Sequence, residues 1–291
     1  MKTTAFLTRL LFATFAVSLL VSAALAQAGT PLKRTTYKTQ EFEAGPGMTL
    51  SLTGAPEGAI RVEGWNERKI EVSAEIEVRA GSEQDLDALA AVTGFVVDEG
   101  LIKIAVTTVG PHDKKYLKKA AKDFPKRLRN SPFTINYTIK VPYYTDLMLD
   151  GGKGKLSIAN VEGAMSIKFL ESDADLVLSG GSVQATIGSG DVTVTLAKPS
   201  WRGRFAEVQV ATGKLDVRMP QDMNANIQAK VLRTGQIENG FERIKPQRLT
   251  HFSDTYMDGI AGNGGATMRF TVGDGTLSLT TVGKPAVAEK Q

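Results

Sequence analysis

The chain has 291 residues, of which 42% are hydrophobic and 23% charged, and its formal net charge is +4. It holds no cysteine and only two histidines, His112 and His251, which lie far apart in the sequence. This composition excludes a disulfide framework and argues against a zinc or redox-metal site, so we expect neither metal nor cofactor.

The N-terminus predicts a secretory signal peptide over residues 1–26. Lys2 and Arg9 precede the apolar run LLFATFAVSLLVSAALA, which ends in a small-x-small cleavage site. The run is short for a membrane span of about 20 residues. We therefore expect cleavage after Ala26, export to the periplasm or the cell surface and exterior, and no transmembrane segment in the mature chain.

Residues 27–36 predict a flexible lead-in, and residues 37–145 an N-terminal β region. Apolar and polar residues alternate between glycine and proline turns in GAIRVEGWNERKIEVSAEIEVRA, as in half-buried strands. The stretch GFVVDEGLIKIAVTTV predicts a hairpin that turns at residues 98–100.

Two short helices are expected to interrupt this β region. The first lies near residues 82–92, with Ser82 as its N-cap and Asp85 at the third helical position. The second lies near residues 112–128, where Pro125 should end or kink it.

The second helix carries the strongest charge pattern in the chain. Residues 112–129 hold eight cations against Asp113 and Asp123, a net charge of +6. With Tyr116 and Phe124 nearby, this segment is a candidate surface for an anionic partner: an envelope polysaccharide, an anionic lipid surface or another envelope protein, but not nucleic acid. The alternative is a solvated helix that covers the end of the β core. The candidate cations are Lys114, Lys115, Lys118, Lys119, Lys122, Lys126, Arg127 and Arg129.

From about residue 146 a short unit recurs: glycine or a small residue, then two apolar residues one apart. Its early copies begin their apolar pairs 9, 11, 7 and 9 residues apart, which is one short strand plus one tight turn. Units of this size must stack to bury their apolar faces. Residues 146–282 therefore predict a β-solenoid, followed by a disordered tail at 283–291. The apolar pairs start at Leu156, Met165, Leu176, Val183, Val192, Leu215, Ile227 and Leu277.

The glycines of LVLSGGSVQATIGSGDVTVTL raise the question of a phosphate-binding loop. Such a loop needs a helix after its glycines, but VTVTL is a β-branched alternation. We therefore expect Gly180, Gly181, Gly188 and Gly190 to serve turns between strands. The same turns could close hairpins, so a β-sandwich of hairpins is the alternative fold.

The stretch YTIKVPYYTDLMLDGGKGKLSIANVEGAMSI, followed by SGGSVQATIGSGDVTV, resembles the bacterial "putative adhesin" family of exported domains of unknown function. The resemblance covers residues 134–279. It implies a β-solenoid-like envelope or surface protein without known catalytic residues. The basic segment departs from the family pattern.

Acidic residues in the turns leave a second function open. A solenoid can carry paired carboxylates for polysaccharide cleavage or calcium binding, but turn and edge roles are the favoured explanation of these residues. Trp65 and Trp201 could serve as sugar platforms or pack into the fold. We predict an exported non-enzymatic scaffold that acts by surface interaction, adhesin-like or envelope-associated; the alternative is a carbohydrate-active enzyme or carbohydrate-binding module. The acidic candidates are Glu171, Asp173, Asp175, Asp191 and Asp216.

Overall fold

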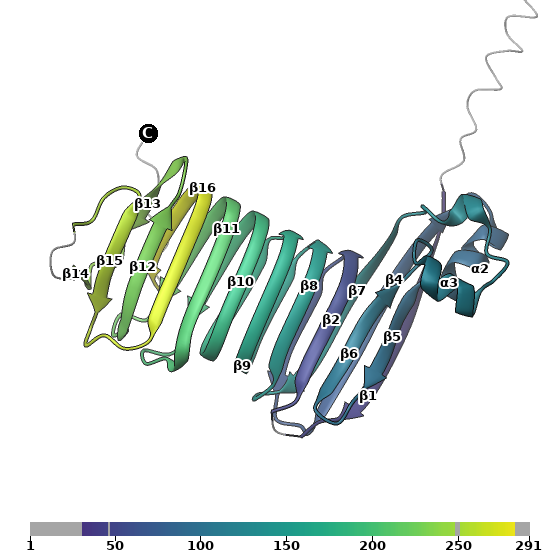
Figure 1. The fold of residues 1–291 in the computed structure, drawn as a ribbon, viewed down its shortest axis with the longest axis horizontal. Helices are drawn as coiled ribbons and strands as arrows, with labels where there is room; N and C mark the ends of the chain where they lie inside the picture. Colours follow the sequence, from purple (N-terminus) through teal and green to yellow (C-terminus); the bar gives the residue numbers. More distant parts are fainter. Residues whose placement is uncertain (1–30, 46, 248–250, 283–291) are drawn as a thin grey trace, which may run out of the picture.

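The computed structural model describes residues 31–45, 47–247 and 251–282 (Figure 1). The predicted signal peptide, the first residues of the predicted lead-in and the predicted tail lie outside these described ranges. Within the described part of the chain, no helix is long and apolar enough to cross a membrane.

The described chain is mostly β, and the described part of its N-terminal half contains eight strands and two α-helices. The strands are β1 (Leu32–Glu43), β2 (Thr49–Glu57), β3 (Ile60–Trp65), β4 (Lys69–Ala80), β5 (Gly94–Glu99), β6 (Lys103–Val109), β7 (Phe133–Pro142) and β8 (Asp146–Lys153). The helices are α2 (Glu83–Val92) and α3 (Lys114–Ala120), with a short 3-10 helix at Lys126–Leu128.

The C-terminal half contains the longest strands, some of which bend from one layer of the molecule to the other. They are β9 (Leu156–Glu171), β10 (Ala174–Leu196), β11 (Arg202–Met219), β12 (Ala225–Val231), β13 (Gly235–Asn239), β14 (Ile244–Pro246), β15 (Tyr256–Ala261) and β16 (Thr267–Thr281).

All strands belong to one large mixed sheet that folds over itself (Figure 1). One layer, layer A, runs β1-β4-β7-β3 and continues into the first part of β9. The other, layer B, runs β5-β6-β2-β8 and continues into the second part of β9. Because β9 contributes to both layers, the apolar side chains of the two layers meet in one buried core.

Strands β8 to β11 stack in parallel, and β16, β12 and β13 continue the parallel pairing, whereas β15 pairs antiparallel with β12 and β14. Leu147 pairs with Met165, which pairs with Val183, so the first two turns of the chain each advance 18 residues. The same ladder continues through Ala206 to Met268 in longer steps. All five side chains are buried, and burial of each larger one stabilises the fold by about 1.5–3 kcal/mol. We call the parallel-paired strands of this region, β8 to β13 and β16 without β14 and β15, the parallel stack.

Glycines mark one corner of the parallel stack. Gly190, Gly213 and Gly275 lie one above the other, with φ values of 138°, 135° and 138°. A Cβ at Gly213 would lie 2.1 Å from the carbonyl oxygen of Gly190, so the close stacking of the corner requires glycine. Gly181, with φ of 100°, lies at another bend of β10. The sequence predicted turns between strands at Gly180, Gly181, Gly188 and Gly190, but all four lie inside the continuous strand β10, where Gly181 and Gly190 have positive φ at its bends.

The two helices lie together at the N-terminal end of the molecule (Figure 1). Helix α2 joins β4 to β5, and its N-cap is Ser82, whose Oγ accepts a hydrogen bond from the Asp85 amide at 3.2 Å. Helix α3 lies between β6 and β7. Leu86 and Leu117 are buried in the common core, so both helices cover this end of the two layers.

Several N-terminal expectations require correction. Residues 32–36, expected to be flexible, form the start of β1, because β1 pairs with β4 along its whole length. The helix expected over 112–128 is shorter: α3 ends at Ala120, before Pro125, and a 3-10 helix follows. The expected boundary between the N-terminal β region and the solenoid, at residue 145, does not mark where parallel pairing begins. Strand β2 pairs in parallel with β8, and β3 pairs in parallel with β9. The hairpin at residues 98–100 is confirmed by antiparallel β5 and β6.

Candidate anion-binding surface

The basic segment, residues 112–129, connects β6 to β7 at the N-terminal end of the core. Asp113 caps α3, and its carboxylate accepts a hydrogen bond from the Tyr116 amide at 2.9 Å. Leu117, Phe124 and Leu128 point inward and are buried. The segment is therefore fixed to the core by apolar side chains while its lysines remain outside. Phe124, expected to be available to a ligand, is 7% exposed and instead anchors the segment.

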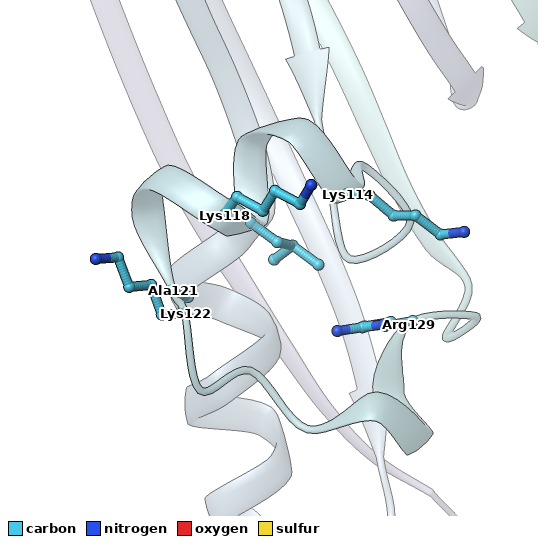
Figure 2. A pocket seen from close by; sticks show the side chains of 6 residues that line it. Lys114, Lys118, Ala121, Lys122 and Arg129 are labelled. Carbon is cyan, nitrogen blue, oxygen red and sulfur yellow. The ribbon is translucent and has the colours of Figure 1, made fainter.

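A hollow of about 330 Å³ lies between α3 and the residues that follow the 3-10 helix. Its floor is apolar, formed by Leu117 and Ala121. Figure 2 shows Lys114, Lys118 and Arg129 beside the hollow, and Lys122 extending to the other side. Four of the eight predicted cations line this hollow: Lys114, Lys118, Lys122 and Arg129.

Most cations of the basic segment have no acidic neighbour. Among the described residues only Arg127 pairs with a carboxylate, that of Asp85 in α2 at 2.5 Å. The Nε of Arg129 is buried and has no hydrogen-bond partner in the described part of the chain. An unpaired buried donor is costly, and clustered cations raise the local concentration of anions. An anionic group bound in the hollow would accept a hydrogen bond from Arg129 and neutralise part of the charge of the clustered cations.

Three of the five predicted acidic residues, Glu171, Asp173 and Asp191, lie at one corner of the stack, and Asp216 does not join them. Glu171 pairs with Lys153 at 2.7 Å. A carboxylate oxygen of Asp173 accepts a hydrogen bond from the Asp191 amide at 3.0 Å, which fixes the corner. Asp216 lies further along the stack and pairs with Arg218 at 2.8 Å. Glu171 and Asp173 line a hollow of about 450 Å³ at this corner. No group of three or more potential metal ligands occurs among the described residues.

The remaining candidate residues take part in packing. His112 stacks on Phe133 with ring centroids 5.4 Å apart, and His251 is exposed. Trp65 donates from Nε1 to the carbonyl oxygen of Lys69 at 2.8 Å. Trp201 donates to the carbonyl oxygen of Gly181 at 3.0 Å, so it braces a corner of the stack. Both indole rings are half-buried.

The grouping of Arg129 with the α3 lysines is a feature that sequence reasoning missed. Arg129 was one of eight cations in a run, and nothing in the run distinguishes it. The bend at Pro125 and the 3-10 helix bring it back beside α3. The proline was the available signal, because it required the chain to leave the helix before Arg129.

Comparisons with known proteins give no family assignment. No protein-family model matches the chain, and no curated protein matches it. A solved structure of a "putative cell adhesion protein" from Clostridium sporogenes is 14% identical, covers 85% of this chain and 100% of its own, and has a TM-score of 0.44. A "putative adhesin" from Bacteroides fragilis is 10% identical, with coverages of 85% and 97% and a TM-score of 0.31. A "putative lipid binding protein" from Parabacteroides distasonis is 11% identical, with coverages of 85% and 95% and a TM-score of 0.25. Similarity at this level supports no conclusion about this chain.

Proposed function

We propose that the protein is an exported, non-enzymatic β-solenoid that acts at the cell envelope by surface interaction, and that its basic segment binds the anionic groups of its partner. The observation that carries this proposal is the hollow beside α3, which Arg129 and three lysines line without a carboxylate partner among the described residues.

The solenoid part of the proposal rests on the parallel stack. Its first two turns each advance 18 residues, and its glycines stack in a column at one corner. A sandwich built from hairpins would pair consecutive strands antiparallel, whereas β8, β9, β10 and β11 pair in parallel. This pairing favours the solenoid.

The anionic partner follows from the chemistry of the hollow. Lysine ammonium groups hold negative charge without demanding one geometry, while the arginine guanidinium forms directed hydrogen bonds to phosphate, sulfate or carboxylate oxygens. The exposed lysines can approach an extended surface, because α3 lies at the end of the molecule (Figure 1). Phosphate-bearing lipid headgroups and acidic polysaccharides share this chemistry.

The non-enzymatic part rests on the roles of the acidic turns. Glu171 already pairs with Lys153, and Asp173 holds the backbone of its corner. A pair of catalytic carboxylates would need to converge on a substrate with separate protonation roles. These contacts favour structural roles for both acids.

The test is a binding measurement on the mature chain from Gln27. Probes are phosphatidylcholine vesicles with and without phosphatidylglycerol, and dextran sulfate beside neutral dextran. The variant Lys114→Gln/Lys118→Gln/Lys122→Gln should bind the anionic probe about 100-fold more weakly, because each lysine near an anionic surface contributes about 1 kcal/mol.

A matched control removes three lysines elsewhere. Lys103, Lys168 and Lys245 are exposed and make no ion pair among the described residues. Their combined change to glutamine lowers the net charge equally and should change binding less than about threefold. Equal losses in the two variants would refute the localised site. Release of sugars from an envelope polysaccharide would refute the non-enzymatic role.

A further inference from the structure

Strand β1 is a long edge of layer A. It pairs with β4 over residues 32–43, and no strand lies on its other side among the described residues. The strand is therefore free to pair along that side, and such edges are templates for a further strand. Tyr37, at its centre, is 76% exposed.

Along β1 the cations come before the acidic residues. Lys33, Arg34 and Lys38 lie in the first part, and Glu41 and Glu43 lie at the end. A parallel neighbour with the same sequence would set like charges side by side, which destabilises pairing. An antiparallel copy sets opposite charges side by side. The charge pattern therefore selects one orientation of a second copy.

We propose that two copies of this chain associate edge to edge through antiparallel β1 strands, with the two-fold axis at Tyr37. In this register Tyr37 lies opposite the partner's Tyr37, and Leu32, which is 40% exposed, lies opposite the partner's Phe42. Shifting the register of the two β1 strands by two residues in either direction separates the Tyr37–Tyr37 pair and the Leu32–Phe42 pairs. On the outer face the register sets Lys33 opposite the partner's Glu41, and Thr35 opposite the partner's Thr39.

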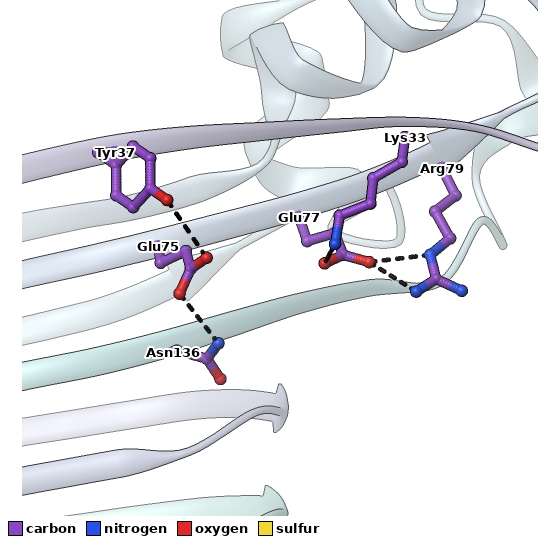
Figure 3. Close-up of polar contacts among 6 residues, drawn as sticks. All are labelled: Lys33, Tyr37, Glu75, Glu77, Arg79 and Asn136. Carbon is purple, nitrogen blue, oxygen red and sulfur yellow. Dashed lines mark hydrogen bonds and ion pairs between the residues drawn. The ribbon is translucent and has the colours of Figure 1, made fainter.

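Contacts on the outer face of layer A hold β1 ready for this pairing (Figure 3). Glu77 of β4 pairs with Lys33 at 2.5 Å and with Arg79 at 2.8 Å. Glu75 accepts hydrogen bonds from the Tyr37 hydroxyl and the Asn136 amide, both at 3.4 Å. These contacts tie β1 to β4 and β7, so little further ordering is needed when a second copy binds.

The inner face of β1 carries a buried polar group, Gln40 Oε1, which has no hydrogen-bond partner in the described ranges. The pairing sets the partner's Arg34 opposite Gln40, and the Arg34 guanidinium of each copy also pairs with Glu83 and Asp87 of its own α2. Edge pairing of this kind extends layer A across both copies and covers two exposed edges at once.

The first test is the concentration dependence of the mass of the mature chain, measured by sedimentation equilibrium. Lys33→Glu should raise the dimer dissociation constant about tenfold, because two Lys33–Glu41 contacts per dimer become repulsive. Lys33→Glu/Glu41→Lys reverses both charges and should restore association. Arg79→Glu is the control, since Arg79 shares the same Glu77 but lies on β4. A chain that stays monomeric at high concentration would overturn the proposal, as would equal effects of Lys33→Glu and Arg79→Glu.

Cross-linking tests the register directly, because the natural chain has no cysteine. Tyr37→Cys should form a disulfide-linked dimer under mild oxidation, since directly opposed Cα atoms lie about 4.5–5.5 Å apart. Thr39→Cys should not, because its own copy lies four residues away, roughly 13 Å along the strand. Mixing Thr35→Cys with Thr39→Cys should restore the cross-link. Equal cross-linking of Tyr37→Cys and Thr39→Cys would contradict this register.

Discussion

The parallel stack and the basic segment at the N-terminal end of the molecule differ in whether their charged side chains form ion pairs. In the stack, two acidic residues near the corners form ion pairs, Glu171 with Lys153 and Asp274 with Arg233. At the N-terminal end the chain leaves the stacked strands, and seven of the eight cations of the basic segment have no acidic partner among the described residues. Ion pairs within the parallel stack stabilise it, whereas the unpaired cations of the basic segment remain available to bind another molecule.

The largest effect expected from this comparison is on stability at a glycine corner. Gly213→Ala places a Cβ 2.1 Å from the Gly190 oxygen at a φ of 135°. We expect a loss of about 3 kcal/mol or more in the free energy of unfolding, measured by urea denaturation. Gly81→Ala, before α2, meets no atom within 4 Å and should change it by less than about 0.5 kcal/mol. Similar losses in the two variants would contradict the role of the corner.

A smaller effect is expected on binding, from two neighbouring arginines. Arg129 lines the hollow, whereas Arg127 pairs with Asp85. Arg129→Gln should weaken binding to phosphatidylglycerol vesicles about tenfold, and Arg127→Gln by less than about threefold. Vesicle co-sedimentation at one salt concentration measures both. A larger loss in the Arg127 variant would move the site away from the hollow.

The smallest effect is a pH dependence in the stack. A hydrogen bond from Lys198 lowers the pKa of Glu162 below its ordinary value, and Arg202 adds to this. Because the folded pKa is lowered, this stabilisation is present above the unfolded pKa of about 4.3 and is lost as the pH falls through the folded value. Glu162→Gln should remove up to about 1 kcal/mol at neutral pH and less at acid pH, measured by thermal unfolding across that range. An equal loss at both pH values would contradict this role of the carboxylate.

Local patterns in the sequence were enough to predict much of the secondary structure. The Ser82 cap, the hairpin at residues 98–100 and the strand alternation each depend on neighbouring residues, and the structure confirms them. The unequal spacing of the repeats concealed how they are arranged. Successive copies fall in alternate layers: Leu156 lies in layer A and Met165 in layer B.

Features that depend on distant residues could not be predicted. Strand β1 begins in a polar stretch, and only its pairing with β4 orders residues 32–36. The hollow needs the chain reversal that brings Arg129 to α3. The acidic turns were ambiguous for the same reason, because the hydrogen bond from the Asp191 amide to Asp173 joins successive turns of the stack.

Hydrogen–deuterium exchange on the mature chain, with and without phosphatidylglycerol vesicles, tests most directly whether the anionic surface binds at the basic segment. The account predicts slower exchange at residues 114–121 and 126–131, with no change at the corner formed by residues 171–173 and 189–191. Protection of that corner, without protection of the basic segment, would contradict the account and place the binding surface on the acidic turns.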